Sequence, residues 1–320
     1  MGFCRHSRGV VLVFVAGILT ILAAMGTSFY AISYSSTASA VRYSDIWRGG
    51  DVPMEGLPCG LSNTVVLLDE DPLHCLIADY AFALAHSGTR HLPVVGAGGP
   101  NRQAQFTRLQ QHAAATKARG VRNMPTILPC CEKPLKRPPS GRPEDTRPES
   151  GPVVNALLKL AEKARPQRPV VVVCAGSTTE VVSAWLRNRS CADRFILVLG
   201  YKNEYIPVRL DPWALEIAVR RFRCIVFQKT YKIGIPPERF AQIRDSRWKQ
   251  VVQREVSMDV PLLAAVALPG FARKVERARC VPDGPGNSRF ETDPDGRIWL
   301  VHDVDMPALK QDVIQTFWGY

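Results

Sequence analysis

The chain has 320 residues, a formal net charge of +12 and 46% hydrophobic residues. Its mean hydropathy of −0.06 is typical of a globular protein and argues against a disordered chain. This length allows one large α/β domain or two small ones, with an ample core.

The basic residues and the cysteines each exclude a class of protein. The lysines and arginines are scattered, with concentrations at 137–147 and 220–254, and no zinc-finger spacing or nucleic-acid recognition module is present. We therefore expect no nucleic-acid partner.

The nine cysteines are odd in number and irregularly spaced, so they do not predict a disulfide framework. The adjacent Cys130 and Cys131 are a candidate redox pair, although no C-x-x-C motif supports that role.

The first forty residues predict a membrane anchor. Residues 10–33 carry no charge, follow Arg5 and Arg8, and are numerous enough to cross a bilayer. The basic flank predicts that the short amino end stays in the cytoplasm. We therefore expect a single-pass membrane protein, with a signal anchor and tether at 1–40 and the main domain, 41–320, outside the cytoplasm.

Two alternatives to the anchor stay open at this point. The small residues Ala38-Ser39-Ala40 form a candidate cleavage site, which would give a secreted or periplasmic protein. The apolar run could instead be a buried core helix. Its terminal position, its lack of charge and its basic flank favour the anchor.

The rest of the chain alternates between strand patterns and helix patterns. Strands are predicted at 64–68, 91–96, 124–128, 169–174, 191–200 and 224–228, with two more around a turn at 293–296. Helices are predicted at 75–85, 103–119, 153–164, 180–187, 236–252 and 306–317, and Asp211-Pro212 is typical of a helix start. This alternation predicts an α/β fold with a mostly parallel central sheet flanked by helices. Residues 132–152, rich in Pro, Arg, Glu and Ser, predict a surface loop that cannot order itself.

An acidic cluster follows the first predicted strand. Asp69, Glu70 and Asp71 stand at its carboxyl end, and Pro72 stands where a helix begins. Ligands of open α/β sheets bind outside the carboxyl ends of the strands. The cluster is therefore the first candidate for a functional site.

This stretch resembles the opening motif of the inosine/uridine-type nucleoside hydrolases, a strand followed by D-x-D-P-G-x-D-D-A. Asp69, Asp71 and Pro72 match the motif without a gap. The resemblance implies a Rossmann-like fold and a calcium site, with Asp71 as a calcium ligand and as the base that takes a proton from the attacking water. The later Asp pair of the motif is replaced by Cys75 and Leu76, so half of the acidic cluster is missing.

Further segments resemble the same family in the same order. Asn101 takes the place of an Asn beside the substrate, and Thr179 that of a Thr whose backbone oxygen binds calcium. Asn203 and Glu204 resemble residues that hold the sugar, and Asp259 falls on the last calcium carboxylate. The resemblance thus implies calcium bound by Asp69, Asp71, Thr179 and Asp259, and a substrate bound by Asn101, Asn203 and Glu204.

Two functional hypotheses follow from this pattern. The first is a membrane-anchored nucleoside hydrolase-like protein, with hydrolysis of the N-glycosidic bond of ribonucleosides as the family chemistry and an activity that the missing Asp pair has altered or removed. The second is a non-catalytic protein of the same fold that binds a nucleoside or another sugar-like small molecule. The sequence leaves the substrate and homo-oligomer formation open.

Overall fold

The computed structural model describes residues 64–69, 77–88, 91–99, 101–200, 210–227, 272–282 and 288–318. All of them belong to one unit of the chain, Met54–Tyr320. The predicted anchor at 1–40 and the predicted helix at 236–252 lie outside these ranges, as do Asp71, Asn203, Glu204 and Asp259. Within the described ranges, no helix is both long enough and apolar enough to cross a membrane.

The described strands form one sheet in the order β3-β2-β1-β4-β5-β6-β9-β7-β8. Their bounds are β1 Thr64–Asp69, β2 His91–Ala97, β3 Thr126–Pro129, β4 Val170–Cys174, β5 Phe195–Gly200, β6 Arg223–Phe227, β7 Ala272–Pro282, β8 Ser288–Thr292 and β9 Ile298–Val304. Every pair from β3 to β9 in this order is parallel, and β7 adds an antiparallel edge with β9 and β8. The prediction of a mostly parallel sheet is confirmed.

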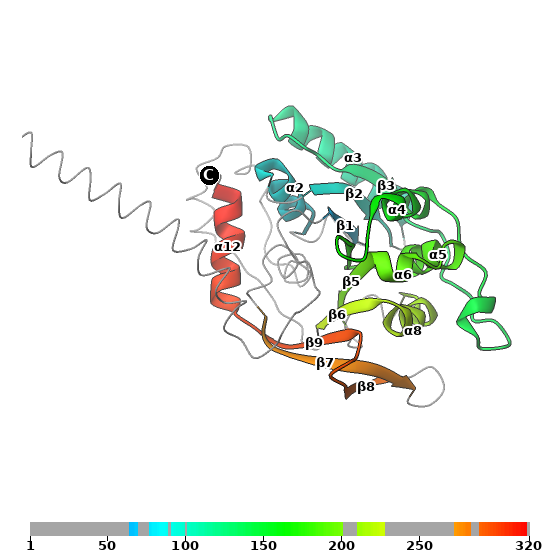
Figure 1. Cartoon of the computed structure of the whole chain (residues 1–320). Helices are drawn as coiled ribbons and strands as arrows, with labels where there is room; N and C mark the ends of the chain where they lie inside the picture. The colour runs from blue at the N-terminus through cyan, green and yellow to red at the C-terminus, as the bar shows by residue number, and fades with distance from the viewer. Residues whose placement is uncertain are drawn as a thin grey trace, which may run out of the picture. The chain divides into compact units, whose positions relative to one another are not determined.

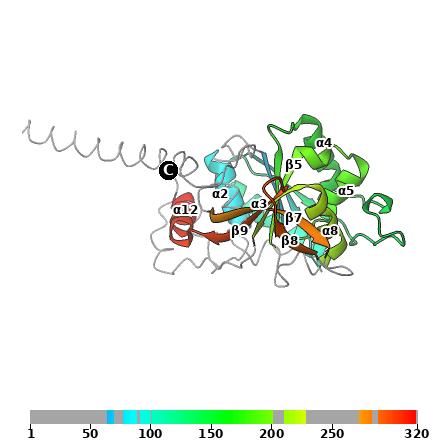
Figure 2. The ribbon, with the colours of Figure 1, turned by 60° about the horizontal axis from the view of Figure 1, so that its bottom comes forward.

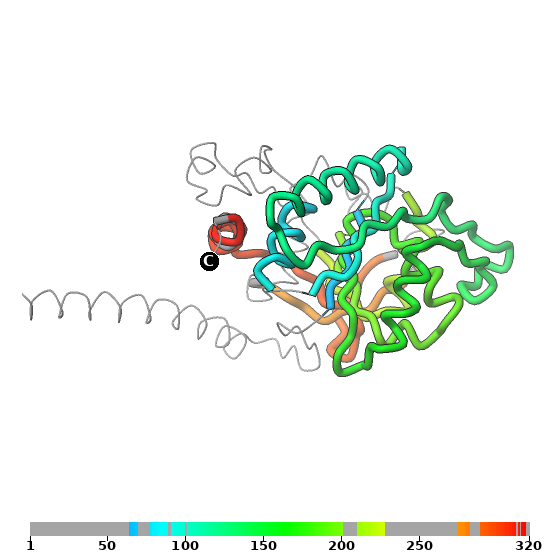
Figure 3. The backbone as a smooth tube through the Cα atoms, turned by 90° about the horizontal axis from the view of Figure 1, so that it is seen from above, coloured from blue at the N-terminus to red at the C-terminus, as the bar shows by residue number. Residues whose placement is uncertain are grey.

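Helices cover both faces of this sheet. Their bounds are α2 Ile77–Ser87, α3 Arg102–Ala118, α4 Pro152–Lys163, α5 Thr179–Arg187, α6 Cys191–Arg194, α8 Pro212–Arg221 and α12 Met306–Trp318, with a 3-10 turn η1 at Pro143–Asp145. Figure 1 labels these elements, and the tube in Figure 3 follows the chain through them. Figure 2 places α2 and α12 on one side of the sheet and α4, α5 and α8 on the other.

The central strands are apolar on both faces because each face packs on helices. In β1, Val65 and Leu67 pack with α2, α3 and α12, whereas Val66 and Leu68 pack with α4, α5 and α8. Side chains alternate between the two faces of a strand, so a strand buried on both sides needs an unbroken apolar run. The run VVVVC of β4 is buried along its whole length for the same reason.

Two sequence predictions needed correction. Residues 191–200 are not one strand, because Cys191–Arg194 form the short helix α6 and only Phe195–Gly200 pair in the sheet. The helical turn leaves Asp193 exposed, where a strand would have carried it into the buried sheet. The sequence also did not predict β7, which lies between β9 and β8, because its many charged residues obscure the alternation typical of a strand.

Neighbouring helices order the segment 132–152. The buried Leu135 donates its backbone N–H to Asp211 over 2.7 Å, and Trp213 donates its indole N–H to Thr146 over 3.0 Å. The Arg137 guanidinium lies 4.8 Å from the ring centre of Trp213. In Figure 1 the segment is the green loop that extends beside α5 and α8. The contacts that hold it come from α8 and from α5, where Ser183 accepts the backbone N–H of Glu149 over 3.1 Å, and local composition does not reveal them.

Candidate functional site

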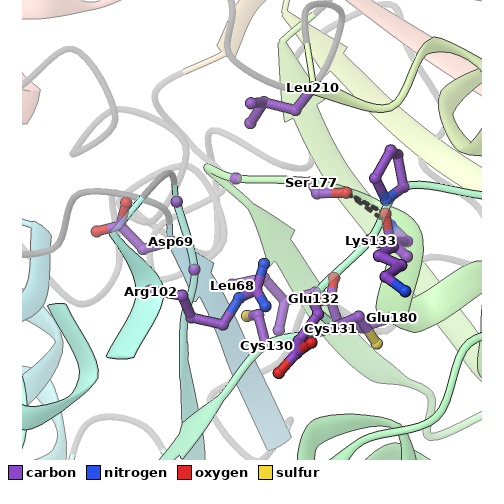
Figure 4. Close-up of a pocket in the computed structure, with 15 residues that line it drawn as sticks. Leu68, Asp69, Arg102, Cys130, Cys131, Glu132, Lys133, Ser177, Glu180 and Leu210 are labelled. Atoms are coloured by element: carbon purple, nitrogen blue, oxygen red, sulfur yellow. Dashed lines mark hydrogen bonds between the residues drawn. The ribbon is translucent and has the colours of Figure 1, made fainter. Parts of the chain in front are cut away.

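A cavity of about 230 Å³ lies at the carboxyl ends of the parallel strands. Its walls come from the ends of β1, β2, β3 and β4 and from the starts of α3 and α5; the polar side chains used below are Asp69, Arg102, Cys130, Cys131, Ser177 and Glu180. Figure 4 shows these side chains around the cavity. From β1 the chain runs outward to β2 and β3 and then returns to β4 on the other side of β1. The cavity therefore lies at the point where the strand order reverses, which is where open α/β sheets bind ligands. We call it the switch-point cavity.

Backbone hydrogen bonds extend the sheet into the cavity wall. Gly98 donates its N–H to the carbonyl of Asp69 over 2.8 Å, and Gly176 donates to the carbonyl of Leu68 over 2.8 Å. These two glycine N–H groups are therefore not available to a ligand. Asp69 lines the cavity from the end of β1 and is 1% exposed. The structure thus places one predicted metal ligand in the wall of the candidate site, with its carboxylate directed away from the other labelled side chains in Figure 4.

A chain of hydroxyl groups leads from the cavity to Asp211. Thr179 donates its hydroxyl to Oδ2 of Asp211 over 2.5 Å, and the Ser177 hydroxyl lies 2.5 Å from that of Thr179. The dashed line in Figure 4 begins at Ser177. Burial raises the pKa of Asp211, although its hydrogen bonds from Thr179, Leu135 and Ala214 act in the opposite direction. The Thr179 hydroxyl therefore holds α5 to Asp211. Calcium binding by the backbone oxygen of Thr179 stays a prediction.

Glu180 is the most buried acid that faces the cavity from a helix. It is 1% exposed, and its Oε1 accepts the backbone N–H of Cys131 over 2.7 Å. Its Oε2 is buried and receives no N–H or O–H donor from the described residues. Burial raises the pKa of Glu180, while the Cys131 N–H and the charge of Arg102 lower it. A hydrogen bond with the Cys130 side chain also lowers the pKa of Glu180, and burial, the largest effect, gives Glu180 an increased tendency to hold a proton.

Cys130 and Cys131 both line the cavity, but their environment does not suit thiolate chemistry. Burial raises the pKa of Cys131, and the nearby charges of Glu180 and Glu149 raise it further. A reactive cysteine needs positive surroundings that lower its pKa. The structure therefore supports Cys131 as a packed thiol beside Glu180 rather than as a redox centre.

Arg102, and not the predicted Asn101, reaches the cavity from the start of α3. Asn101 is the N-cap residue of this helix, is exposed, and makes no side-chain capping bond. Its contact with a substrate stays a prediction. Arg102 lines the cavity. The sequence did not indicate it as a site residue, because a single arginine after a turn is part of no recognisable motif.

The described residues do not supply a calcium site by themselves. No group of three or more His, Cys, Asp or Glu side chains among them could hold a metal ion. Calcium takes six to eight oxygen ligands, most often with several carboxylates. Two of the predicted carboxylate ligands, Asp71 and Asp259, lie outside the described residues, so the calcium site stays a prediction from the resemblance.

Comparisons with known proteins identify the fold. No protein family model matches the chain, and no curated protein matches it in sequence. Among solved structures, an inosine-guanosine nucleoside hydrolase superposes with a TM-score of 0.57 at 11% identity, covering 81% of this chain and 99% of the other. A purine-preferring ribonucleoside hydrolase from Gardnerella vaginalis gives 0.53 at 14% identity, covering 79% and 98%. The chain has the nucleoside hydrolase fold.

A third neighbour of this fold is not named as a hydrolase. It is the type III effector protein XopQ complexed with adenosine diphosphate ribose, with a TM-score of 0.53 at 12% identity, covering 88% of this chain and 98% of the other. At such low identity, these likenesses establish the fold alone. The expected fold is thereby confirmed over most of the chain, and the activity must be argued from the site.

Proposed function

We propose that the protein is a nucleoside hydrolase-like protein that binds a ribose-containing small molecule in the switch-point cavity and acts on its N-glycosidic bond. The observation that carries this proposal is the buried acid Asp69 at the end of β1, a residue that lines a cavity at the strand-order reversal. Cleavage of an N-glycosidic bond develops positive charge on the sugar ring. A carboxylate held in a water-poor site stabilises such charge more strongly than one in water.

The residues of the site divide the work of such a reaction. Asp71, two residues beyond Asp69, is the base by resemblance, and it would remove the proton of the attacking water. Asp69, two residues before Asp71 in the sequence, supplies a negative charge. Asp69, Asp71 and Asp259 are the carboxylates that would hold a calcium ion, with the backbone oxygen of Thr179, and the ion would supply positive charge beside the water and the sugar hydroxyls.

The first experiment is a hydrolysis assay with the full-length protein. Ribose release from inosine, guanosine, adenosine and uridine would be measured as reducing sugar, with millimolar calcium and with a chelator. We expect ribose release that Asp71→Ala abolishes. Asp193→Ala should leave it unchanged, because Asp193 is exposed and does not line the cavity. Absence of release from every nucleoside, with the protein folded, would reject the catalytic proposal.

The second candidate is a non-catalytic binding protein, and a specific sequence observation favours it. Cys75 and Leu76 replace the Asp pair that the motif requires, and neither offers a ligand for a hard cation. Calorimetric binding of a nucleoside without turnover would support this candidate. Calorimetry with calcium, using Asp71→Ala as the control, would show whether the metal site persists.

The location of the protein is a proposal of its own. We propose that residues 1–40 anchor it in a membrane with the main domain outside the cytoplasm, because an uncharged run follows basic residues. Protease protection in sealed membrane vesicles tests this orientation. Recovery of the protein in the soluble fraction with its first forty residues intact would reject the anchor.

A further inference from the structure

The carboxylate of Asp211 fixes the direction of the hydrogen bonds that lead to Ser177. Oδ1 of Asp211 accepts the N–H of Ala214, and Oδ2 accepts the N–H of Leu135. These two N–H groups and the N-terminus of α8, which Asp211 caps, favour the ionised form of the acid. An ionised carboxylate can only accept hydrogen bonds, so the hydroxyl of Thr179 is the donor across the 2.5 Å that separate it from Oδ2.

The hydroxyl of Ser177 must then donate to Thr179. The single hydrogen of the Thr179 hydroxyl is used on Asp211, so the hydrogen between the two hydroxyl oxygens, 2.5 Å apart, comes from Ser177. Oγ of Ser177 also accepts the backbone N–H of Thr179 over 3.0 Å. A serine hydroxyl has one hydrogen and two lone pairs. After these two bonds Ser177 retains one lone pair and no hydrogen.

This lone pair is the part of Ser177 that a ligand can use. Ser177 lines the switch-point cavity, is half-buried, and makes no further hydrogen bond with the described residues. Figure 4 shows it at the cavity wall. An oxygen that offers only a lone pair binds N–H or O–H groups and repels atoms that carry lone pairs without a hydrogen. Ser177 is therefore a hydrogen-bond acceptor with a fixed polarity, although a serine can usually serve as donor or acceptor.

The wall around Ser177 has the same preference for ligand donors. Several of its backbone N–H groups donate within the protein: that of Gly98 to Asp69, Gly176 to Leu68, Cys130 to Ala97, Cys131 to Glu180, and Thr179 to Ser177. In sites that bind phosphate, such N–H groups point at the ligand instead. Among the described lining residues, the acids are Asp69, Glu132 and Glu180, and they outnumber the cations Arg102 and Lys133. The described wall thus favours a ligand that brings hydrogen-bond donors.

We propose that Ser177 determines ligand specificity in the switch-point cavity by accepting a hydrogen bond from a hydroxyl or amino group of the ligand. The ligand class is then a sugar or nucleoside with a donor at this position, and analogues that carry fluorine there are rejected. This inference rests on the proposed function, because it uses the same cavity. It does not depend on whether the N-glycosidic bond is broken.

Calorimetry with sugar-modified nucleosides tests the polarity of Ser177. The full-length protein would be titrated with inosine, guanosine, adenosine and uridine. The nucleoside that binds most tightly would then be compared with analogues whose 2′, 3′ or 5′ hydroxyl is replaced by an amino group or by fluorine. An amino group can donate, whereas fluorine has lone pairs and no hydrogen. At one of these positions we expect the amino analogue to bind about threefold to tenfold more tightly than the fluoro analogue, the range for one hydrogen bond.

Variants of Ser177 separate its acceptor role from a structural one. Ser177→Ala should remove the preference for the amino analogue, because the acceptor is gone. Ser177→Thr, which keeps a hydroxyl, should retain the preference. Ser150→Ala, at an exposed serine that does not line the cavity, should also retain it. If Ser177→Ala does not fold, Ser177→Cys serves instead, and it should lose most of the preference because a thiol is a weak acceptor.

A variant of Thr179 tests the chain of hydrogen bonds directly. Thr179→Val leaves Ser177 in place but takes away the oxygen to which Ser177 donates. The Ser177 hydroxyl can then turn its hydrogen to a ligand, so the fluoro analogue should bind more tightly to this variant, relative to the amino analogue, than to the unmodified protein.

The outcomes distinguish this inference from the proposed function. Nucleoside binding with equal affinities for the amino and fluoro analogues at all three positions would overturn the role of Ser177 and leave the proposed function in place. A preference that Ser177→Ala leaves intact would do the same. No binding by any of the four nucleosides, with the protein folded, would overturn both.

Discussion

The hydroxyl of Thr179 donates to Oδ2 of Asp211 across 2.5 Å and thereby ties the first residue of α5 to the N-cap of α8. The same carboxylate accepts the N–H of Ala214 over 2.9 Å and the N–H of Leu135 over 2.7 Å. One buried acid thus joins two helices and the segment 132–152. Because Thr179 also lines the switch-point cavity, this junction sets the position of the cavity wall.

Replacing Asp211 should destabilise the protein strongly. Asp211→Ala removes a helix cap, which costs about 0.5–2 kcal/mol, and leaves the buried N–H of Leu135 without its acceptor, which costs about 1–3 kcal/mol. We expect a loss of about 2–4 kcal/mol in the free energy of unfolding, measured with urea. Asp193→Ala, at an exposed acid, should change it by less than about 0.5 kcal/mol. Similar values for the two variants would contradict the role of Asp211.

The stability of the protein should depend on pH through Glu180. Burial raises the pKa of this group in the folded state above its ordinary value of 4.5, so the folded protein retains a proton that the unfolded chain releases. Stability relative to Glu180→Gln should therefore fall as pH rises above 4.5, and it should level off once the pH passes the folded-state pKa. The slope between these limits is at most about 1.4 kcal/mol per pH unit.

The Gln variant isolates this effect from other titrating groups. Asp211 also has a raised pKa, but it is present in both proteins and cancels in the difference. The Cys131 thiol beside Glu180 stays neutral in this range, since burial raises its pKa. Urea unfolding between pH 4.5 and 8 provides the measurement. Parallel pH curves for the two proteins would show that Glu180 titrates normally in the folded state.

Loss of one hydroxyl should loosen the segment 132–152. Thr146→Val keeps the side-chain shape but leaves the indole N–H of Trp213 without its acceptor, and both residues are buried. We expect destabilisation by about 1–3 kcal/mol. Limited digestion with a glutamate-specific protease should cut after Glu144 or Glu149 sooner than in the unmodified protein. Thr107→Val, at an exposed threonine of α3, should digest at the original rate; an equal change in both variants would contradict the anchoring role of Thr146.

The sequence by itself determined the sheet and most of its helices. Apolar runs such as that of β4 can only be stable when both faces are covered, so they predict buried parallel strands without further information. The start of α8 was predictable in the same way, because Asp211 followed by Pro212 satisfies the first N–H groups of a helix locally. The position of Asp69 at a strand end was predictable from the same pattern.

Only the tertiary structure decided which side chains meet in the cavity. Arg102, Cys131 and Glu180 are far apart in the chain, and they come together because β1 lies between β2 and β4 in the sheet. The expectation that the segment 132–152 cannot order itself was wrong for the same reason, since its partners Asp211 and Trp213 belong to a later element of the chain. Local patterns describe what a segment can bury, whereas strand order determines what it is buried against.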